Sequence, residues 1–201
     1  MISIQDFQST SLTLGETKGC YTPLLVDGQS VKLQVCSAEG MRAPFGVNDS
    51  YSGGETQTMP LVPTPEFEVF ANEIDALVPV LVEPRSTELF GEKKSLSQLK
   101  DMYKPLVHLS KNQEHDNTVH VKIRPKTLID IATCDGYVKG TTEDIVRGAR
   151  VLVVIRLGSV WQQENKTFGV TLETVRVLAH LPPKRVRVED VFPVRPSLPT
   201  R

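Results

Sequence analysis

The 201-residue sequence predicts a mainly β fold that carries inserted helices. Residues 147–181 have the alternation of a long β-hairpin, and residues 118–126 have the alternation of a further strand. Helical periodicity is confined to residues 64–107, between these strands and the β-like runs nearer the N-terminus. We therefore expect a sheet with one helical insertion.

The first arm of the predicted hairpin has the most regular alternation in the chain. Every second residue of 151–157 is apolar, whereas the opposite face begins and ends with Arg150 and Arg156. The turn is predicted at residues 163–166, where Asn165 tolerates a left-handed conformation at little cost.

The return arm, residues 167–178, is rich in β-branched side chains. Its alternation places three apolar residues on one face: Phe168, Val170 and Leu172. Trp161, the single tryptophan of the chain, comes just before the turn, and the pattern leaves open whether it fills the core or faces solvent.

The N-terminal part contains short β-like runs at residues 11–14, 23–26 and 30–36. Asp27 and Gly28 separate the last two runs. Because Asp-Gly between apolar runs favours a tight turn with positive φ, we expect these two strands to pair as a hairpin.

A loop rich in turn-forming residues follows at 43–54, and residues 56–62 are expected to return to the sheet. Thr64 and Pro65 then predict the start of a helix, since one is a good cap and the other suits the first helical position. Its apolar stripe is expected to be core, and Pro79 is expected to kink or end the helix.

A second helix is predicted from the capping box that begins at Ser95, and Pro105 stops it. Residues 118–126 and 128–133 follow as two strands, the first with a basic face. We interpret residues 136–148 as a connection into the hairpin.

The composition, 39% hydrophobic and 23% charged, is that of an ordinary soluble protein. No apolar run is long enough to span a membrane, and the N-terminus lacks the pattern of a secretory signal. The cysteines are odd in number and widely spaced, which favours a reducing, intracellular setting over a disulfide framework: Cys20, Cys36 and Cys134.

The net charge of −1 conceals an uneven distribution along the chain. Residues 1–117 hold 9 Lys and Arg against 16 Asp and Glu, and residues 118–201 hold 14 against 8. A basic C-terminal half indicates an anionic partner, although basic strands paired with acidic helices of the same domain would explain the asymmetry equally well.

Motifs for catalysis are lacking in the sequence. No nucleophile elbow, zinc-protease motif, paired-cysteine motif or P-loop is found. His115 and His120 lie near two acids in the segment QEHDNTVH, but their spacing does not match a defensible metal-ligand pair. We therefore expect no enzyme activity, no metal and no cofactor.

Binding of single-stranded nucleic acid requires a positive groove for phosphates and aromatic faces on which bases stack. Phe168 is a candidate for stacking, but its apolar neighbours favour a core position. The predicted contact residues are Arg42, Lys122, Arg124, Lys126, Arg150, Arg156, Trp161, Lys166 and Arg176.

Four segments of the chain together resemble a known family. They are MRAPFGV from Met41, ELF from Glu88 with LKDMYKPLV from Leu99, HVKI from His120 and KTFGVT from Lys166. In this order and spacing they resemble the single-stranded DNA-binding proteins assigned to nucleocytoplasmic large DNA viruses, a family similar to the phage T7 type.

The resemblance implies an OB-fold-like antiparallel barrel that coats unwound DNA during viral replication, recombination or repair. We therefore expect one OB-like domain over residues 1–181, with the helical insertion around 64–107. The composition of residues 182–201 predicts a proline-containing, partly disordered basic tail. Phage proteins of this type have an acidic tail that recruits replication proteins, so the basic tail puts that kind of recruitment in doubt.

The expected partners are single-stranded DNA and replication proteins, with a second copy of the chain as a further option and no membrane. The expected location is intracellular, in the host nucleus or a cytoplasmic viral factory if the chain is viral. The alternative hypothesis is a structural or scaffold protein of a virion or replication complex, which the acidic N-terminal half and the proline-containing tail favour. A nucleic-acid-processing enzyme is a weaker alternative, because it needs a carboxylate cluster that the sequence does not reveal.

Overall fold

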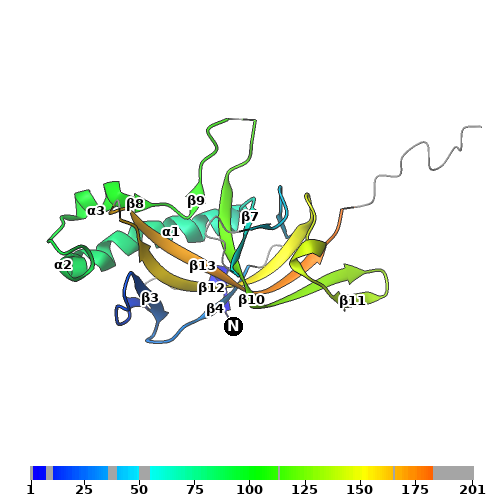
Figure 1. Cartoon of the computed structure of the whole chain (residues 1–201), viewed down its shortest axis with the longest axis horizontal. Coiled ribbons are helices and arrows are strands. Elements are labelled where there is room, and N and C mark those ends of the chain that lie inside the picture. Colours follow the sequence, from blue (N-terminus) through cyan, green and yellow to red (C-terminus); the bar gives the residue numbers. More distant parts are fainter. Residues whose placement is uncertain are drawn as a thin grey trace, which may run out of the picture.

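The predicted hairpin is the centre of the structure, a computed structural model that describes residues 2–7, 11–35, 40–49, 55–112, 114–164 and 166–182. Its arms are β12 (Arg150–Gln162) and β13 (Phe168–His180), which pair antiparallel and run through the whole molecule (Figure 1). The hairpin prediction is thus confirmed. At the turn Lys166 has a φ of 65°, and Asn165 lies outside the described residues.

Three short strands lie end to end along the free edge of β12. These are β3 (Tyr21–Val26), β4 (Lys32–Val35) and β5 (Met41–Arg42), each antiparallel to β12. The predicted hairpin between the first two is therefore wrong. Asp27 and Gly28 do take positive φ values of 49° and 74°, but they close only a local turn, because both strands pair with the longer edge of β12.

The other flank of the hairpin is formed by β10 (Thr118–Thr133), which unites the two strands predicted there. β10 runs parallel to β13 and antiparallel to β7 (Gln57–Leu61). The sheet is therefore mixed, and not purely antiparallel as expected for the barrel. The hairpin fixes β12 and β13 antiparallel to each other, but β10 is joined to β13 by a long connection and can pair with β13 in the parallel direction.

The path through the main sheet is β1-β4-β12-β13-β10-β7-β6. β11 (Gly136–Lys139) pairs with the end of β10, inside the stretch predicted as a plain connection. The other short strands are β1 (Ile2–Ser3), β2 (Leu12–Leu14), β6 (Asn48–Asp49), β8 (Tyr103–Lys104) and β9 (Val107–His108).

The two flanks of the sheet approach each other beyond β5 and β7. Among the described residues they meet in an isolated bridge, in which the Val62 N–H donates to the Arg42 carbonyl at 2.9 Å. One bridge is not a ladder, so the described strands form a curved sheet and not a closed barrel.

The predicted helical insertion contains α1 (Pro65–Val82), α2 (Ser86–Phe90) and α3 (Leu96–Met102). The Thr64 cap and the Ser95 capping box are both present, as predicted. α1 continues three residues beyond Pro79, so the proline does not end it. Short 3-10 turns occur at Ile4–Asp6, Glu83–Arg85 and Thr142–Asp144.

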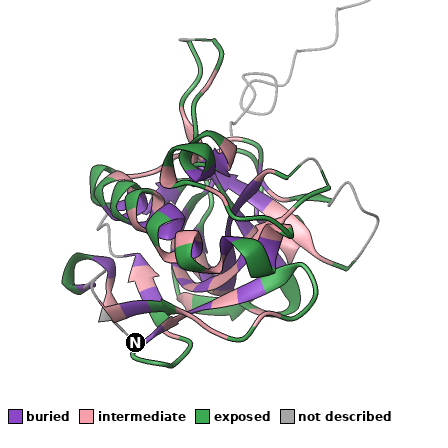
Figure 2. Cartoon of the chain, turned by 90° about the vertical axis from the view of Figure 1, so that its left-hand side faces the viewer, coloured by how far each residue is buried: buried purple, intermediate pink, exposed green. Residues whose placement is uncertain are grey.

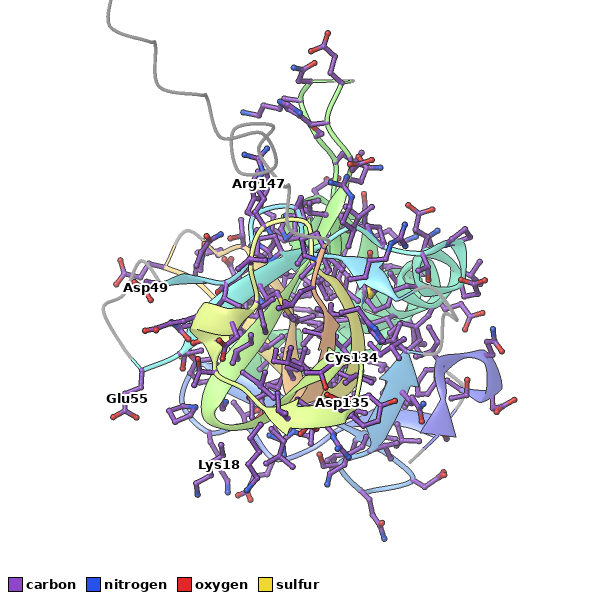
Figure 3. The ribbon with its side chains drawn as sticks, turned by 90° about the vertical axis from the view of Figure 1, so that its right-hand side faces the viewer. Lys18, Asp49, Glu55, Cys134, Asp135 and Arg147 are labelled. Carbon is purple, nitrogen blue, oxygen red and sulfur yellow. The ribbon has the colours of Figure 1, made fainter. Side chains whose placement is uncertain are left out.

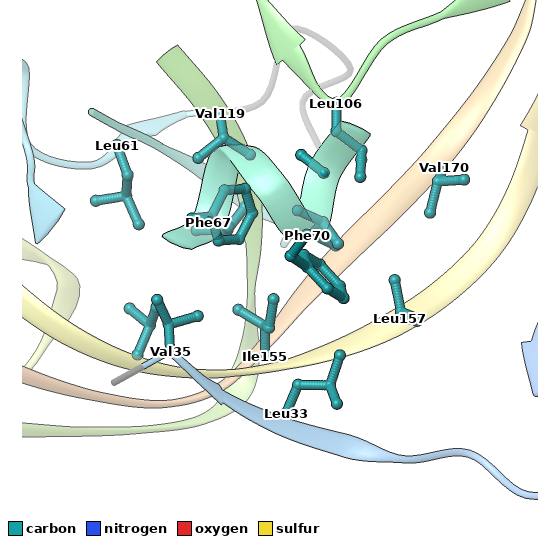
Figure 4. Close-up of a cluster of buried hydrophobic side chains, with 14 of the residues drawn as sticks. Leu33, Val35, Leu61, Phe67, Phe70, Leu106, Val119, Ile155, Leu157 and Val170 are labelled. Atoms are coloured by element: carbon teal, nitrogen blue, oxygen red, sulfur yellow. The ribbon is translucent and has the colours of Figure 1, made fainter. Parts of the chain in front are cut away.

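The core lies between α1 and the inner face of the strands. Phe67 and Phe70 of α1 are buried against side chains such as Leu33 and Ile155 (Figure 4), and the buried residues gather where helices and strands face each other (Figure 2). Burial of each such side chain stabilises the fold by roughly 1.5–3 kcal/mol. The inner face is thereby covered, which leaves the outer face of β10, β12 and β13 for other contacts.

Some sequence predictions concern residues outside the described ranges. Cys36 and the basic residues of the tail, Lys184, Arg185 and Arg187, belong to this group. Cys20 and Cys134 are exposed free thiols. Within the described ranges, none of the helices combines the length and the apolar character needed to cross a membrane.

Candidate nucleic-acid interface

Two adjoining hollows lie on the outer face of the sheet, with volumes of about 350 and 380 Å³. They share Tyr21, Thr58, Lys122 and Thr171, so we treat them as one groove. The groove crosses β3, β12, β13, β10 and β7, and the segment after β8 contributes to its lining. Its other aromatic and charged members are Lys104, His108, His120, Arg124, Trp161 and Glu173.

The strand register explains why these side chains meet. Arg156 on β12 pairs with Glu173 on β13, which pairs with Lys122 on β10. Directly paired residues point to the same side of a sheet, so the row crosses one face. Residues on either side of this row, such as Ile155 and Leu172, point into the core.

Trp161 lies on the outer face and is only partly buried. It pairs with Tyr21 on one side and with Gly169 on the other. A Cβ atom on Gly169 would lie 2.7 Å from Cζ2 of the indole, so the ring rests on the glycine backbone. Tyr21 is 50% exposed, and two aromatic side chains therefore stand side by side at this end of the groove.

Glu173 lies beneath two arginines in the middle of the face. Its carboxylate accepts hydrogen bonds from Arg124 and Arg156, and its side chain is 11% exposed, against 54% and 41% for the arginines. Burial raises the pKa of Glu173, but the hydrogen bonds from Arg156 and Arg124 outweigh this and leave the pKa below its ordinary value. Each guanidinium has five N–H donors, so both arginines keep donors for a ligand in the groove.

Lys122 and Lys104 add positive charge that is not neutralised locally. Within the described ranges, neither lysine has a carboxylate at ion-pair distance. Lys122 lines both hollows, and Lys104 lines the first. Three cationic side chains line the groove, Lys104, Lys122 and Arg124, and Arg156 adjoins it through Glu173, the one carboxylate in the lining. The groove is therefore electropositive and suited to an anion.

His108 and His120 form a ring pair at the margin of the groove, with centroids 4.5 Å apart. Burial lowers the pKa of both imidazoles, and for His120 the neighbouring His108 lowers it further. The two rings are therefore neutral at pH 7 and present flat apolar surface beside Lys104 and Lys122. His120 does not join His115 in a metal cluster: the described residues contain no group of three or more potential ligands.

The structure brings together four of the nine predicted contact residues, namely Lys122, Arg124, Arg156 and Trp161. Lys126 is exposed on the irregular stretch of β10 next to Arg124. The other four lie elsewhere: Arg42 pairs with Asp116, Lys166 with Glu92, Arg176 with Asp130, and Arg150 lies at the start of β12.

Five aromatic or charged residues of the groove were not among the predicted contacts: Tyr21, Lys104, His108, His120 and Glu173. The alternation of residues 118–126 already placed His120 on the basic face. The others come from segments whose pairing has no local signal, and Tyr21 reaches Trp161 only because β3 runs along the edge of β12.

Phe168 and the glycines of both Phe-Gly pairs have structural roles, whereas Phe45 is 59% exposed. Phe168 is fully buried against the rings of Phe90 and Tyr103, which confirms the preferred core position. Gly46 has a φ of 72°, and a Cβ there would lie 2.6 Å from the Ile145 carbonyl oxygen. Both glycines thus permit close approaches that another residue would block.

Comparison with known proteins adds information on the fold. No protein-family model matches the sequence, and no curated protein matches it. The single-stranded DNA-binding protein gp2.5 of bacteriophage T7 is similar in structure, with 14% identity, a TM-score of 0.50 and coverage of 80% of this chain and 92% of that one. This similarity shows a shared fold.

Structures of the single-stranded DNA-binding protein of bacteriophage Enc34 also match. The free protein has 14% identity, a TM-score of 0.42 and coverage of 90% of this chain and 98% of that chain. Its complex with single-stranded DNA has 14% identity, a TM-score of 0.43 and coverage of 86% and 97%.

Proposed function

We propose that this chain binds single-stranded DNA, with little sequence preference, in the outer-face groove. The observation that carries the proposal is the placement of Trp161 and Tyr21 beside Lys122 and the two arginines above Glu173. This arrangement offers both of the contacts that an unpaired strand needs, a stacking surface and donors for phosphate.

The aromatic end of the groove supplies the stacking. Every base has a π-face, so a Trp or Tyr ring accepts any of them, and one stack is worth about 1–3 kcal/mol. In a duplex the bases are already stacked on each other. The groove therefore favours single strands over duplex DNA.

The cationic part of the groove supplies the phosphate contacts. Lys104, Lys122 and Arg124 line the groove, and Arg156 adjoins it through Glu173. These four positive charges, less the one negative charge of Glu173, can neutralise about three phosphates. Counterion release then gives a slope of about −2 in log affinity against log salt, or roughly a 20-fold loss between 50 and 200 mM salt.

The shared fold with the T7 protein supports an OB-like arrangement, in which the outer sheet face and its adjoining loops form the ligand surface. The proposed role is non-catalytic. Stacking and phosphate contact need no nucleophile, metal or general base, and the groove carboxylate is held by two arginines.

The biological setting is a further part of the proposal and rests on the resemblance in sequence. We place the chain in the giant-virus family, where it would coat unwound strands during viral replication, recombination or repair inside the infected cell. Replication proteins, and a second copy of the chain, are the proposed protein partners.

The experiment is a titration of the full chain with labelled oligo-dT and duplex DNA at 50 and 200 mM salt, with Trp161 fluorescence as a second signal. The expected result is tighter binding of the single strand, a loss of roughly 20-fold at the higher salt and quenching of Trp161. Absence of binding at 50 mM salt would overturn the proposal and favour the scaffold alternative. Equal affinity for duplex would refute single-strand selectivity.

A further inference from the structure

The outer face continues past the groove into a third hollow of about 290 Å³. Its floor is apolar and is formed by Leu152, Val154 and Leu178. Tyr137 of β11 and Arg176 of β13 stand at its rim. The same two strands, β12 and β13, therefore run beneath both the groove and this hollow.

The register places these residues on the face that carries the groove. Leu152 pairs with Leu178 and Val154 with Arg176, alternating with the buried Val153 and Val177. Tyr137 pairs with Ala132 of β10 and is 70% exposed. β11 lies at the end of the molecule away from the helices (Figure 1), and Figure 3 views that end, with Cys134 and Asp135 marking the turn before β11.

Arg176 is held in the same way as the arginines of the groove. Its guanidinium donates to Asp130, with Nη2 at 2.7 Å and Nε at 2.9 Å, and its side chain is 59% exposed against 19% for Asp130. In both places a less exposed carboxylate on a neighbouring strand fixes a guanidinium whose remaining donors face solvent.

We propose that this hollow is a second contact station for the same DNA strand, in which Tyr137 stacks on a base and Arg176 binds a phosphate. The inference rests on the proposed function of the groove. The occupant is assigned as nucleic acid because the hollow and the groove lie on the same face of β12 and β13, and because its rim repeats the combination of an aromatic ring with an exposed arginine.

The spacing of the two stations predicts the length of DNA that reaches both. Trp161 and Leu152 are nine residues apart on β12, which is about 30 Å at 3.3 Å per residue. At about 3.4 Å per nucleotide of a stacked strand, this is roughly nine nucleotides, within the 4–16 that one OB fold occupies. Strands shorter than this span cannot use both stations.

The test compares oligo-dT of 5 and 16 nucleotides on the full chain carrying Tyr137→Ala. The expected result is a loss of about 10-fold in affinity for the 16-mer, as for removal of one base stack, and no change for the 5-mer. Tyr137→Phe should restore the 16-mer affinity. Val138→Ala, the neighbouring residue on the opposite face of β11, should bind both strands like the unmodified chain.

The outcomes separate this inference from the proposed function. If the unmodified chain binds neither strand, the groove itself is refuted. If it binds both and Tyr137→Ala binds the 16-mer equally well, only the second station is refuted. A Tyr137→Ala variant that changes the sedimentation mass but not DNA affinity would also overturn the inference, since the hollow would then be a contact between copies.

Discussion

Replacement of Glu173 by glutamine tests whether the net positive charge of the groove contributes to DNA affinity. The substitution keeps an oxygen that can accept hydrogen bonds from Arg124 and Arg156, but it removes the only carboxylate lining the two hollows of the groove within the described ranges. The two guanidiniums then have no anion beneath them, and the groove gains one positive charge. We expect tighter binding of single-stranded DNA and a lower stability of the folded chain.

The size of both effects follows from the structure. Each additional neutralised phosphate steepens the slope of log affinity against log salt by about 0.7. If the contact contributes nothing at 1 M salt, it raises the affinity about 8-fold at 50 mM and about 3-fold at 200 mM salt. Loss of the charge weakens two charge-assisted hydrogen bonds. Because the arginines are about half exposed, we expect unfolding to become easier by only about 1–2 kcal/mol.

The assay is fluorescence anisotropy with oligo-dT across 50 to 200 mM salt, alongside urea unfolding of the same samples. Glu88→Gln is the matched control, because Glu88 also accepts from an arginine, Arg85, but lies on α2 outside the groove. A folded Glu173→Gln variant with an unchanged salt slope would refute the assignment of these arginines to phosphate binding.

Two further predictions concern the ring systems of the groove. Gly169→Ala should displace the indole of Trp161, because the new Cβ would lie 2.7 Å from the ring. The fluorescence emission of Trp161 should shift, and the affinity for single-stranded DNA should fall about 10-fold. An unchanged spectrum together with normal binding would contradict this packing. Affinity should also rise as the pH falls from 7.5 to 5.5. Burial lowers the pKa of His108 and His120 in the free chain, and the negative charge of a bound phosphate favours their protonated form, so binding is linked to proton uptake. The pH dependence, measured by the same anisotropy assay, should be lost in the double variant His108→Gln, His120→Gln, and its persistence there would refute the role of the pair.

The elements that periodicity defines were predictable from sequence. The alternation of residues 151–157 and the cap at Thr64 predict β12 and α1, because each pattern depends on neighbours only a few residues away. The predicted hairpin at Asp27-Gly28 was wrong for the opposite reason, because strand pairing depends on distant residues. The Asp-Gly dipeptide predicts a turn, but it does not determine which strand each arm pairs with. Both β3 and β4 pair with β12, which follows more than a hundred residues later in the chain.

The candidate site was predictable on the strands whose faces alternate. Lys122, Arg124 and Arg156 were found because they alternate with buried residues, and Trp161 because it precedes the turn. Tyr21 and Lys104 were missed because each reaches the groove through a pairing with a distant strand. Arg42 and Lys166 have the right charge, but they form ion pairs away from the groove.

Binding of single-stranded DNA in the outer-face groove is tested most directly by a charge reversal in the middle of the groove. Lys122 lines both hollows without an ion-pair partner in the described part of the chain, and Lys100 on α3 is an exposed lysine outside the groove. We predict that Lys122→Glu lowers oligo-dT affinity at 50 mM salt by at least about 10-fold while Lys100→Glu leaves it nearly unchanged, both variants keeping the unfolding midpoint of the original chain. Equal affinities for the two folded variants would show that the groove does not bind the strand.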